Sequence, residues 1–247
     1  MDEGQKTNDL RSYAVWDAPT RWFHWINAIT VVGLIAAGTV IMNAGTLGIG
    51  NPGKIVLKTV HVWIGYAFVL NLCWRFIWAF FGNRHARWRA MLPGGPGYLK
   101  ALRSYVSAFI AGAPQHYLGH NPLGRVAVAA LFLLITVQAV TGLLLAGTDL
   151  FHPPFGSAIA QWIAAPGVDP STLVPYSPDL YEADAYERMR ALRAPVVETH
   201  EIGFYALLIA TLLHVAAVVI TELREGGSLV SAMLTGRKIL PRKPVDE

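Results

Sequence analysis

Four of the eight histidines in this 247-residue chain lie within, or at the edge of, long apolar segments: His24, His61, His200 and His214. A histidine inside a membrane segment is costly, so it is treated as functional; the alternative for any single one is a polar contact with a neighbouring helix. Two imidazoles on facing helices can clamp an iron porphyrin from both sides. Because such ligation leaves no open position on the iron, it suits electron transfer rather than oxygen binding.

The spacing of these histidines predicts how they pair. His200 and His214 are 14 residues apart, so on a helix they share one face and are separated by about 21 Å along its axis. His24 opens the first apolar segment and His61 opens the second, from the opposite side. Depth therefore predicts the ligand pairs His24–His214 and His61–His200. Cys73 is the only cysteine, which excludes a C-x-x-C-H attachment site and predicts two non-covalent haem b groups.

The composition predicts that helices position these histidines in a membrane. Hydrophobic residues make up 53% of the chain and charged residues 15%, whereas a soluble domain averages about 25% charged residues. A helix of about 20 apolar residues crosses the hydrocarbon core. We therefore expect an all-α integral membrane four-helix bundle, a single cytochrome b domain over residues 1–247. The predicted spans are 22–42, 59–81, 126–147 and 198–221.

Lysine and arginine predict the orientation. They gather in the N-terminal segment, in the loop between spans two and three, and in the C-terminal tail. Basic residues stay on the cytoplasmic side, so we expect both termini inside and the loop 148–199 on the outer side of the membrane. Residues 1–10 are polar and mixed in charge, unlike a cleaved signal peptide. The inner basic residues are Lys6, Arg11, Arg21, Arg84, Arg87, Arg89, Lys100, Arg103, Arg125, Arg224, Arg237, Lys238, Arg242 and Lys243.

Two loops carry further predictions. In the inner loop, Leu99, Leu102, Val106 and Phe109 share one helical face, which predicts a short helix on the membrane surface. The outer loop 148–199 is acidic, and its composition predicts an irregular start before a short helix at 179–192. We expect this long loop to dock a soluble redox partner; the alternative is a lid over the outer haem. The remaining histidines are expected to be solvated loop residues: His85, His116, His120 and His152.

Small and charged residues near the histidines predict the haem surroundings. Gly65 is one turn from His61, and Gly38 is 14 residues from His24, so both are expected to give clearance to a flat macrocycle; the alternative is helix packing. Arg75 is 14 residues after His61. We expect Arg75 either to bind a propionate of the inner haem or to extend to the cytoplasmic surface.

Several motifs resemble the bacterial di-haem cytochrome b membrane subunits. This family includes the cytochrome b subunit of nickel–iron hydrogenases and, more distantly, the gamma subunit of formate dehydrogenase. The resemblance covers the membrane portion, and the histidine set is its most specific part. The matching stretches are Arg21-Trp22-Phe23-His24-Trp25-Ile26-Asn27, His61-Val62-Trp63-Ile64-Gly65, Asn121-Pro122-Leu123-Gly124-Arg125, Thr141-Gly142, His200-Glu201 with His214, and the tail segments 226–229 and 235–238.

The resemblance implies a respiratory-chain cytochrome b of the bacterial inner membrane, with the loop 148–199 in the periplasm, that passes electrons between an outer partner and a quinone beside the inner haem. Asn121 would line the quinone pocket; the alternative is a turn residue before Pro122. The implied partners are the membrane, the quinone and a periplasmic redox protein, either a hydrogenase or, given the long outer loop, a c-type cytochrome. The chain would be the electron-transfer subunit of an oxidoreductase with quinone reductase or quinol oxidase activity. No nucleic-acid partner is indicated, and an oligomer is compatible with the sequence.

Two other functions use the same histidines. A superoxide-oxidising, quinone-reducing cytochrome b is one, although its expected mark is a short chain without a docking loop. A non-haem membrane metalloprotein is the other. A zinc protease would carry H-E-x-x-H, but after His200-Glu201 the second histidine is missing. A metal channel would require carboxylates inside the spans, and we expect none there.

Overall fold

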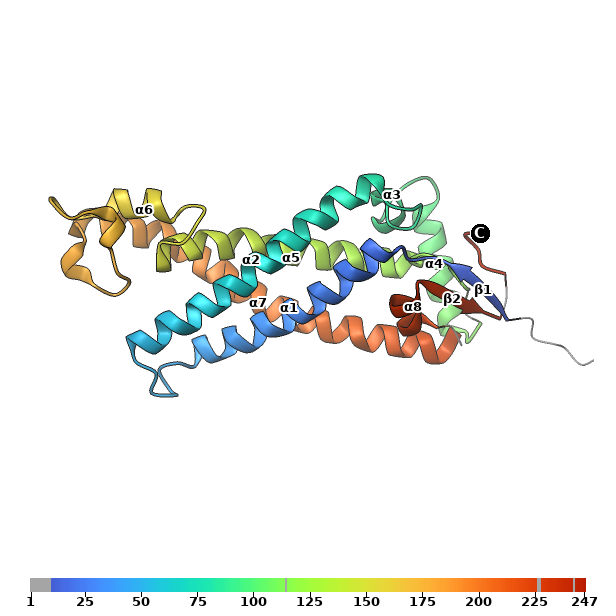
Figure 1. Ribbon diagram of the computed structural model, residues 1–247. Helices are drawn as coiled ribbons and strands as arrows, with labels where there is room; N and C mark the ends of the chain where they lie inside the picture. Colours follow the sequence, from blue (N-terminus) through green and yellow to red (C-terminus); the bar gives the residue numbers. More distant parts are fainter. Residues whose placement is uncertain (1–9, 114, 226–227, 242) are drawn as a thin grey trace, which may run out of the picture. The chain divides into compact units, whose positions relative to one another are not determined.

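The fold is dominated by four long helices (Figure 1). The computed structural model describes residues 10–113, 115–225, 228–241 and 243–247; Lys6, Arg242 and the Gly226-Gly227 pair lie outside these ranges. Each long helix is apolar enough over its length to cross a membrane, which confirms the predicted all-α class with four spans. The four helices are α1 (Ala18–Met42), α2 (Asn51–Phe81), α5 (Pro122–Leu150) and α7 (Ala183–Glu225).

The long helices extend beyond the predicted apolar spans, most of all α7. The separate helix expected at 179–192 and the span expected at 198–221 are one helix that continues through Pro195. Proline removes a single backbone N–H from the helix, and the hydroxyl of Thr199 donates to the Pro195 carbonyl at 2.7 Å. The connection between α5 and α7 covers residues 151–182; that residues 148–199 lie outside the membrane stays a prediction.

The long helices contain carboxylates, so the expectation that the spans hold none is wrong; Glu198 and Glu201 lie even within the predicted span 198–221. Asp149 lies in α5, and Glu198 and Glu201 lie in α7. Even so, within the described ranges no three or more His, Cys, Asp and Glu side chains are grouped to hold a metal ion.

Two compact units divide the chain, and all four long helices contribute to both. The first unit comprises Met1–Trp25, Cys73–Phe132 and Ile209–Glu247, and the second comprises Ile26–Leu72 and Leu133–Leu208. His24 and His214 belong to the first unit, whereas His61 and His200 belong to the second. Each predicted histidine pair is therefore contained in one unit.

A small antiparallel sheet in the first unit joins the two ends of the described chain. Strand β1 (Arg11–Ala14) pairs with β2 (Arg237–Leu240), with Ser12 opposite Ile239, and the two strands lie side by side in Figure 1. This sheet was not predicted, because each strand is only four residues long and its partner is more than 200 residues away. The same unit contains α3 (Trp88–Met91), α4 (Tyr98–Ile110) and α8 (Leu229–Thr235).

The helix predicted in the inner loop is present as α4. Tyr105 is buried on one side of α4, whereas Leu99 and Ile110 are largely exposed. The exposed apolar side chains are those expected of a helix at a membrane surface. Its placement on the membrane remains a prediction.

The C-terminal tail holds the loop that precedes α5. The carboxylate of Asp246 accepts hydrogen bonds from the backbone N–H groups of Leu118 and Gly119, at 2.6 and 3.0 Å. The ammonium group of Lys238 donates to the carbonyl of Tyr117 at 2.6 Å. Bonds to charged groups are among the stronger ones in proteins, so the tail fixes the conformation of this loop.

The connection 151–182 in the second unit is folded rather than irregular. It contains α6 (Gly156–Ile163), η1 (Pro170–Thr172) and η2 (Pro178–Leu180), and Figure 1 shows α6 beside the start of α7. Its core also includes residues of the first turns of α7, so the connection and the helix bury one another. The core residues are Ala160, Ile163, Leu173, Tyr181, Ala185 and Met189.

Candidate functional site

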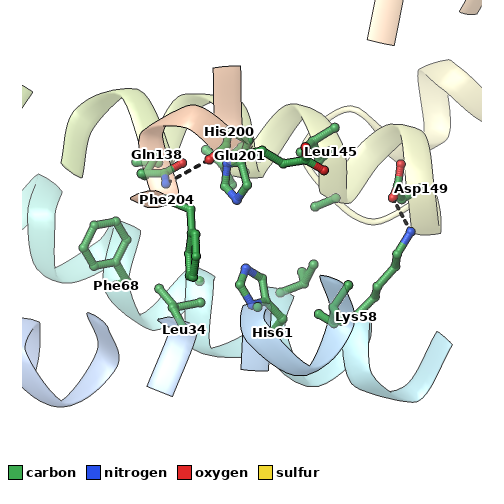
Figure 2. Close-up of a pocket in the computed structure, with 18 of the residues that line it drawn as sticks. Leu34, Lys58, His61, Phe68, Gln138, Leu145, Asp149, His200, Glu201 and Phe204 are labelled. Atoms are coloured by element: carbon green, nitrogen blue, oxygen red, sulfur yellow. Dashed lines mark hydrogen bonds and ion pairs between the residues drawn. The ribbon is translucent and has the colours of Figure 1, made fainter. Parts of the chain in front are cut away.

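A cavity of about 260 Å³ lies in the second unit and is lined by all four long helices (Figure 2). His61 of α2 and His200 of α7 face each other across it. Their ring centroids are 6.4 Å apart and their ring planes are inclined at 73°. Most of the remaining lining is apolar, which is typical of a pocket for a cofactor.

The distance between the two rings fits a shared metal ion. A bond from a metal to an imidazole nitrogen is about 2 Å long, and the ring centre lies about 1 Å behind that nitrogen. Two imidazoles that bind one metal ion from opposite sides therefore have centres about 6 Å apart. The observed 6.4 Å matches this gap. In addition, the buried Nδ1 of His61 has no hydrogen-bond partner among the described residues.

Thr141 fixes the protonation of the His200 ring. Its hydroxyl lies 2.7 Å from Nδ1 of His200 and 2.8 Å from the carbonyl oxygen of Val137. A hydroxyl has one hydrogen, and the carbonyl can only accept, so Thr141 donates to Val137 and accepts from Nδ1–H of His200. The lone pair is then on Nε2, the tautomer that a metal-binding imidazole needs. Thr141 belongs to a motif quoted for the family resemblance, but its role was not predicted.

Glycines leave room on the helix faces that line the cavity. A Cβ atom at Gly65 would meet nothing within 4 Å, so this position opens onto free space. A Cβ atom at Gly38 would lie 3.6 Å from Cε1 of His61, and one at Gly142 would lie 3.4 Å from Cε1 of His200. The clearance role of Gly38 and Gly65 stays a prediction.

His24 and His214 lie in the first unit. The two side chains are close enough to interact electrostatically, and Nδ1 of His24 is buried without a partner among the described residues. The ring of His24 also packs edge-on against Trp25 at 5.2 Å between centroids. The structure thus brings the second predicted pair into one neighbourhood, with no ring-to-ring contact like that of His61 and His200.

Arg75 is buried in the first unit instead of reaching the surface. Its side chain is 2% exposed and donates to the carbonyl of Ala86 at 2.9 Å. The rings of Phe23 and Phe132 lie 5.7 and 5.9 Å from its guanidinium carbon. Its Nη1 has no partner within the described ranges, so the surface alternative is wrong and a donor remains available for an anion.

Asn121 caps the start of α5. Its Oδ1 accepts from the N–H of Gly124 at 2.6 Å, and its Nδ2 donates to the hydroxyl of Tyr105, also at 2.6 Å. An Asn at this position satisfies a free N–H of the first helical turn. Both polar ends of the side chain are therefore engaged in structural contacts, as the turn alternative expected.

Three of the four loop histidines are not solvated as predicted, whereas His152 is only half-buried. His85 and His116 are buried, and the ring of His120 packs on Trp16 with centroids 5.0 Å apart. Burial lowers the pKa of His120 to about 3, and the nearby charge of Arg75 contributes. The prediction of solvated side chains failed because the C-terminal tail and the segment that contains β1 cover both inner loops, and these segments are distant from the loops in sequence.

An ion cluster at the cavity was also missed. Asp149 of α5 accepts from Lys58 of α2 at 2.5 Å and from both Nε and Nη2 of Arg193 of α7, the latter at 2.9 Å. All three residues line the cavity, and Figure 2 shows the Lys58–Asp149 pair at one end of it. The sequence offered a signal, since Lys58 is one turn before His61 and Arg193 is two turns before His200.

Four membrane-spanning helices with histidines facing across an apolar cavity define a class, that of multi-pass membrane cytochromes. Residues 15–236 match the family described as prokaryotic cytochrome b561, and the chain belongs to that family. It is therefore a b-type, haem-binding electron-transport protein of the bacterial inner membrane. No solved structure matches the chain.

The curated proteins that this chain resembles are named as B-type cytochrome subunits of Ni/Fe-hydrogenases. A probable Ni/Fe-hydrogenase B-type cytochrome subunit of Rhizobium leguminosarum bv. viciae is 26% identical over 96% of this chain and 92% of that protein. The one from Rhodobacter capsulatus is 29% identical over 92% of this chain and 81% of that protein. A probable Ni/Fe-hydrogenase 1 B-type cytochrome subunit of Escherichia coli is 29% identical over 56% of this chain.

Proposed function

We propose that the chain relays electrons between a periplasmic redox partner and the membrane quinone pool through two haems. His61 and His200 would hold the outer haem, and His24 and His214 the inner one. The observation that carries the proposal is the 6.4 Å separation of the His61 and His200 rings across an apolar cavity. When bound, each haem would supply one-electron redox chemistry with no open position on iron.

The chain's own residues would orient and enclose the outer haem. Thr141 holds His200 in the tautomer that presents Nε2, and the open space beside Gly65 leaves room for a flat ring. Phe68 and Phe204 line the same cavity and exclude water from it. Exclusion of water favours electron transfer over side reactions.

The quinone site is proposed in the first unit, near Asn121 and His214. His120 supports this position, because its Nδ1 is buried without a partner in the described part of the chain. A pKa of about 3 keeps its imidazole neutral at physiological pH, so the ring can both donate and accept a hydrogen bond. Such a group suits a ligand that carries carbonyl or hydroxyl oxygens, as quinones and quinols do.

A quinol analogue should reduce the haem of the purified protein. A quinone-site inhibitor should then shift the spectral component that disappears in His214→Ala and leave the other component unchanged. The reason is that the proposed pocket and His214 belong to the same unit. If the inhibitor perturbs only the component that disappears in His200→Ala, the quinone site lies elsewhere.

For the outer partner we propose a hydrogenase, because the similar proteins are named as hydrogenase subunits. The folded connection 151–182 would contribute to docking. It lies inside the matched residues 15–236 and exposes large apolar side chains, among them Trp162, Val174 and Tyr176. Exposed apolar groups among charged ones are typical of interaction surfaces.

Only some of the acidic residues in the predicted outer loop 148–199 are available to a partner. Asp169 accepts from the backbone and hydroxyl of Ser171, and Glu182 accepts from the N–H groups at the start of α7. Asp149 is engaged by Lys58 and Arg193. By contrast, Asp179 is exposed, and Glu187 is 68% exposed in its side chain, where it pairs with the exposed Arg190.

A combined Asp179→Lys and Glu187→Lys variant should retain its haem but exchange electrons with the partner several-fold more slowly at low salt. Reversing surface charges mainly lowers the association rate, and salt screens the effect. Stopped-flow spectroscopy at two ionic strengths measures the difference from wild type, which should vanish at high salt. Glu247→Lys is the control for a single charge reversal, since it replaces one carboxylate by an ammonium group on the first unit. Equal rates for all three proteins at low salt would mean that these carboxylates do not face the partner.

A further inference from the structure

Lys58, Arg193 and Asp149 form an ionic cluster at the cavity; Glu201 also lines the cavity but forms no ion pair with the two basic residues among the described ones. Lys58 and Arg193 both form ion pairs with Asp149, whose side chain is 12% exposed, while their own side chains are 21% and 29% exposed. Two cations and one carboxylate leave a net charge of +1. In a partly buried site between membrane helices an unbalanced charge is costly, so such groups pair with an anion. The cluster therefore has capacity for a further anionic group.

The position of the cluster relative to the histidines is defined by three helices. Lys58 precedes His61 by three residues, about one turn, on α2, and Arg193 precedes His200 by seven, about two turns, on α7. Asp149 follows Gly142, whose Cα faces the His200 ring, by seven residues on α5. The carboxylate of Asp149 also interacts electrostatically with His200. All three ionic groups thus lie toward the same end of the cavity.

The rest of the cavity has a different character. Away from the cluster, leucine and phenylalanine side chains such as Leu34, Phe68 and Phe204 line it (Figure 2). The cavity therefore has one cationic end and one apolar end. This polarity matches a haem, which carries its two propionate carboxylates on one edge and only hydrocarbon groups on the opposite edge.

We infer that Lys58 and Arg193 bind the propionates of the haem held by His61 and His200, an inference that rests on the proposed function. The guanidinium of Arg193 suits a planar carboxylate, with which it can form two parallel hydrogen bonds. Asp149 is the positioning residue that holds both basic side chains at the cavity end. The haem edge with the propionates then faces the connection 151–182, whose Tyr176 ring lies 5.4 Å from the Lys58 ammonium group.

The experiment compares carboxylate vibrations in holoprotein variants. Haem with ¹³C in its propionate carboxyls, obtained by feeding labelled 5-aminolevulinate, identifies propionate bands in redox-difference infrared spectra. Bands of the outer haem are those that disappear in His200→Ala. Lys58→Gln and Arg193→Gln should shift these bands and lower the midpoint potential of that haem, because nearby positive charge favours the reduced form. Asp149→Asn should raise the potential.

Matched controls are Lys54→Gln on α2 and Arg190→Gln on α7, which remove charge outside the cavity lining and should leave the bands unchanged. If Arg193→Gln does not fold, Arg193→Lys keeps the charge without the planar fork and should give a smaller shift. Unshifted propionate bands in both Lys58 and Arg193 variants that keep two haems would overturn this inference alone. A haem content near one per chain in the wild type would instead contradict the proposed function.

Discussion

A His200→Ala variant is expected to retain one haem b per chain, and the wild-type protein is expected to retain two. His200 is one of the two rings that face each other across the cavity at 6.4 Å, and a single remaining imidazole would leave one axial position of iron without a protein ligand. The pyridine haemochrome assay against protein concentration measures the ratio. His61→Ala should lose the same spectral component, and the double variant should lose nothing more, since both residues act on one haem.

His152→Ala is the matched control, because His152 belongs to the same unit but does not line the cavity. It should keep both haems. The corresponding pair in the first unit, His24→Ala and His214→Ala, should each remove the other component. If His24→Ala and His61→Ala removed the same component, the pairing by depth would be wrong.

The helical class and the four spans could be predicted because they rest on long local signals. Runs of apolar residues identify α1, α2, α5 and α7, and no distant contact is needed to make them helical. The predicted ends of these helices were less accurate. An apolar segment stops at the first polar side chains, whereas the backbone hydrogen bonds of the helix continue beyond them. Pro195 shows this most clearly, because proline usually ends a helix yet α7 runs through it.

The features that sequence reasoning missed depend on contacts between distant segments. The pairing of β1 with β2 and the burial of His85 and His116 both require the tail to fold back on the first unit. The cluster of Lys58, Asp149 and Arg193 joins three helices. The spacing of residues along one helix does not give the distance between two helices, so this cluster could not be predicted. By contrast, His61 and His200 were paired from depth alone, because each membrane helix fixes the level of its residues.

A bulky side chain in place of Gly65, which lines the cavity, is expected to exclude one haem. Gly65→Leu should lower the haem content from two to one per chain while the protein stays folded. Nothing lies within 4 Å of a Cβ atom at this position, so a leucine side chain would enter the free space without straining the backbone. It would also improve helix propensity by about 1 kcal/mol relative to glycine. The only group it would exclude is one that occupies the cavity when bound.

Two variants make the Gly65 result specific. Gly65→Ala adds one carbon and should keep part or all of the outer haem. Ala67→Leu adds a comparable volume on the exposed face of the same helix, and it should keep both haems. Circular dichroism and size-exclusion chromatography establish that all three proteins are folded. If Gly65 served only helix packing, its open surroundings would make leucine harmless, and Gly65→Leu would retain two haems with an unchanged spectrum.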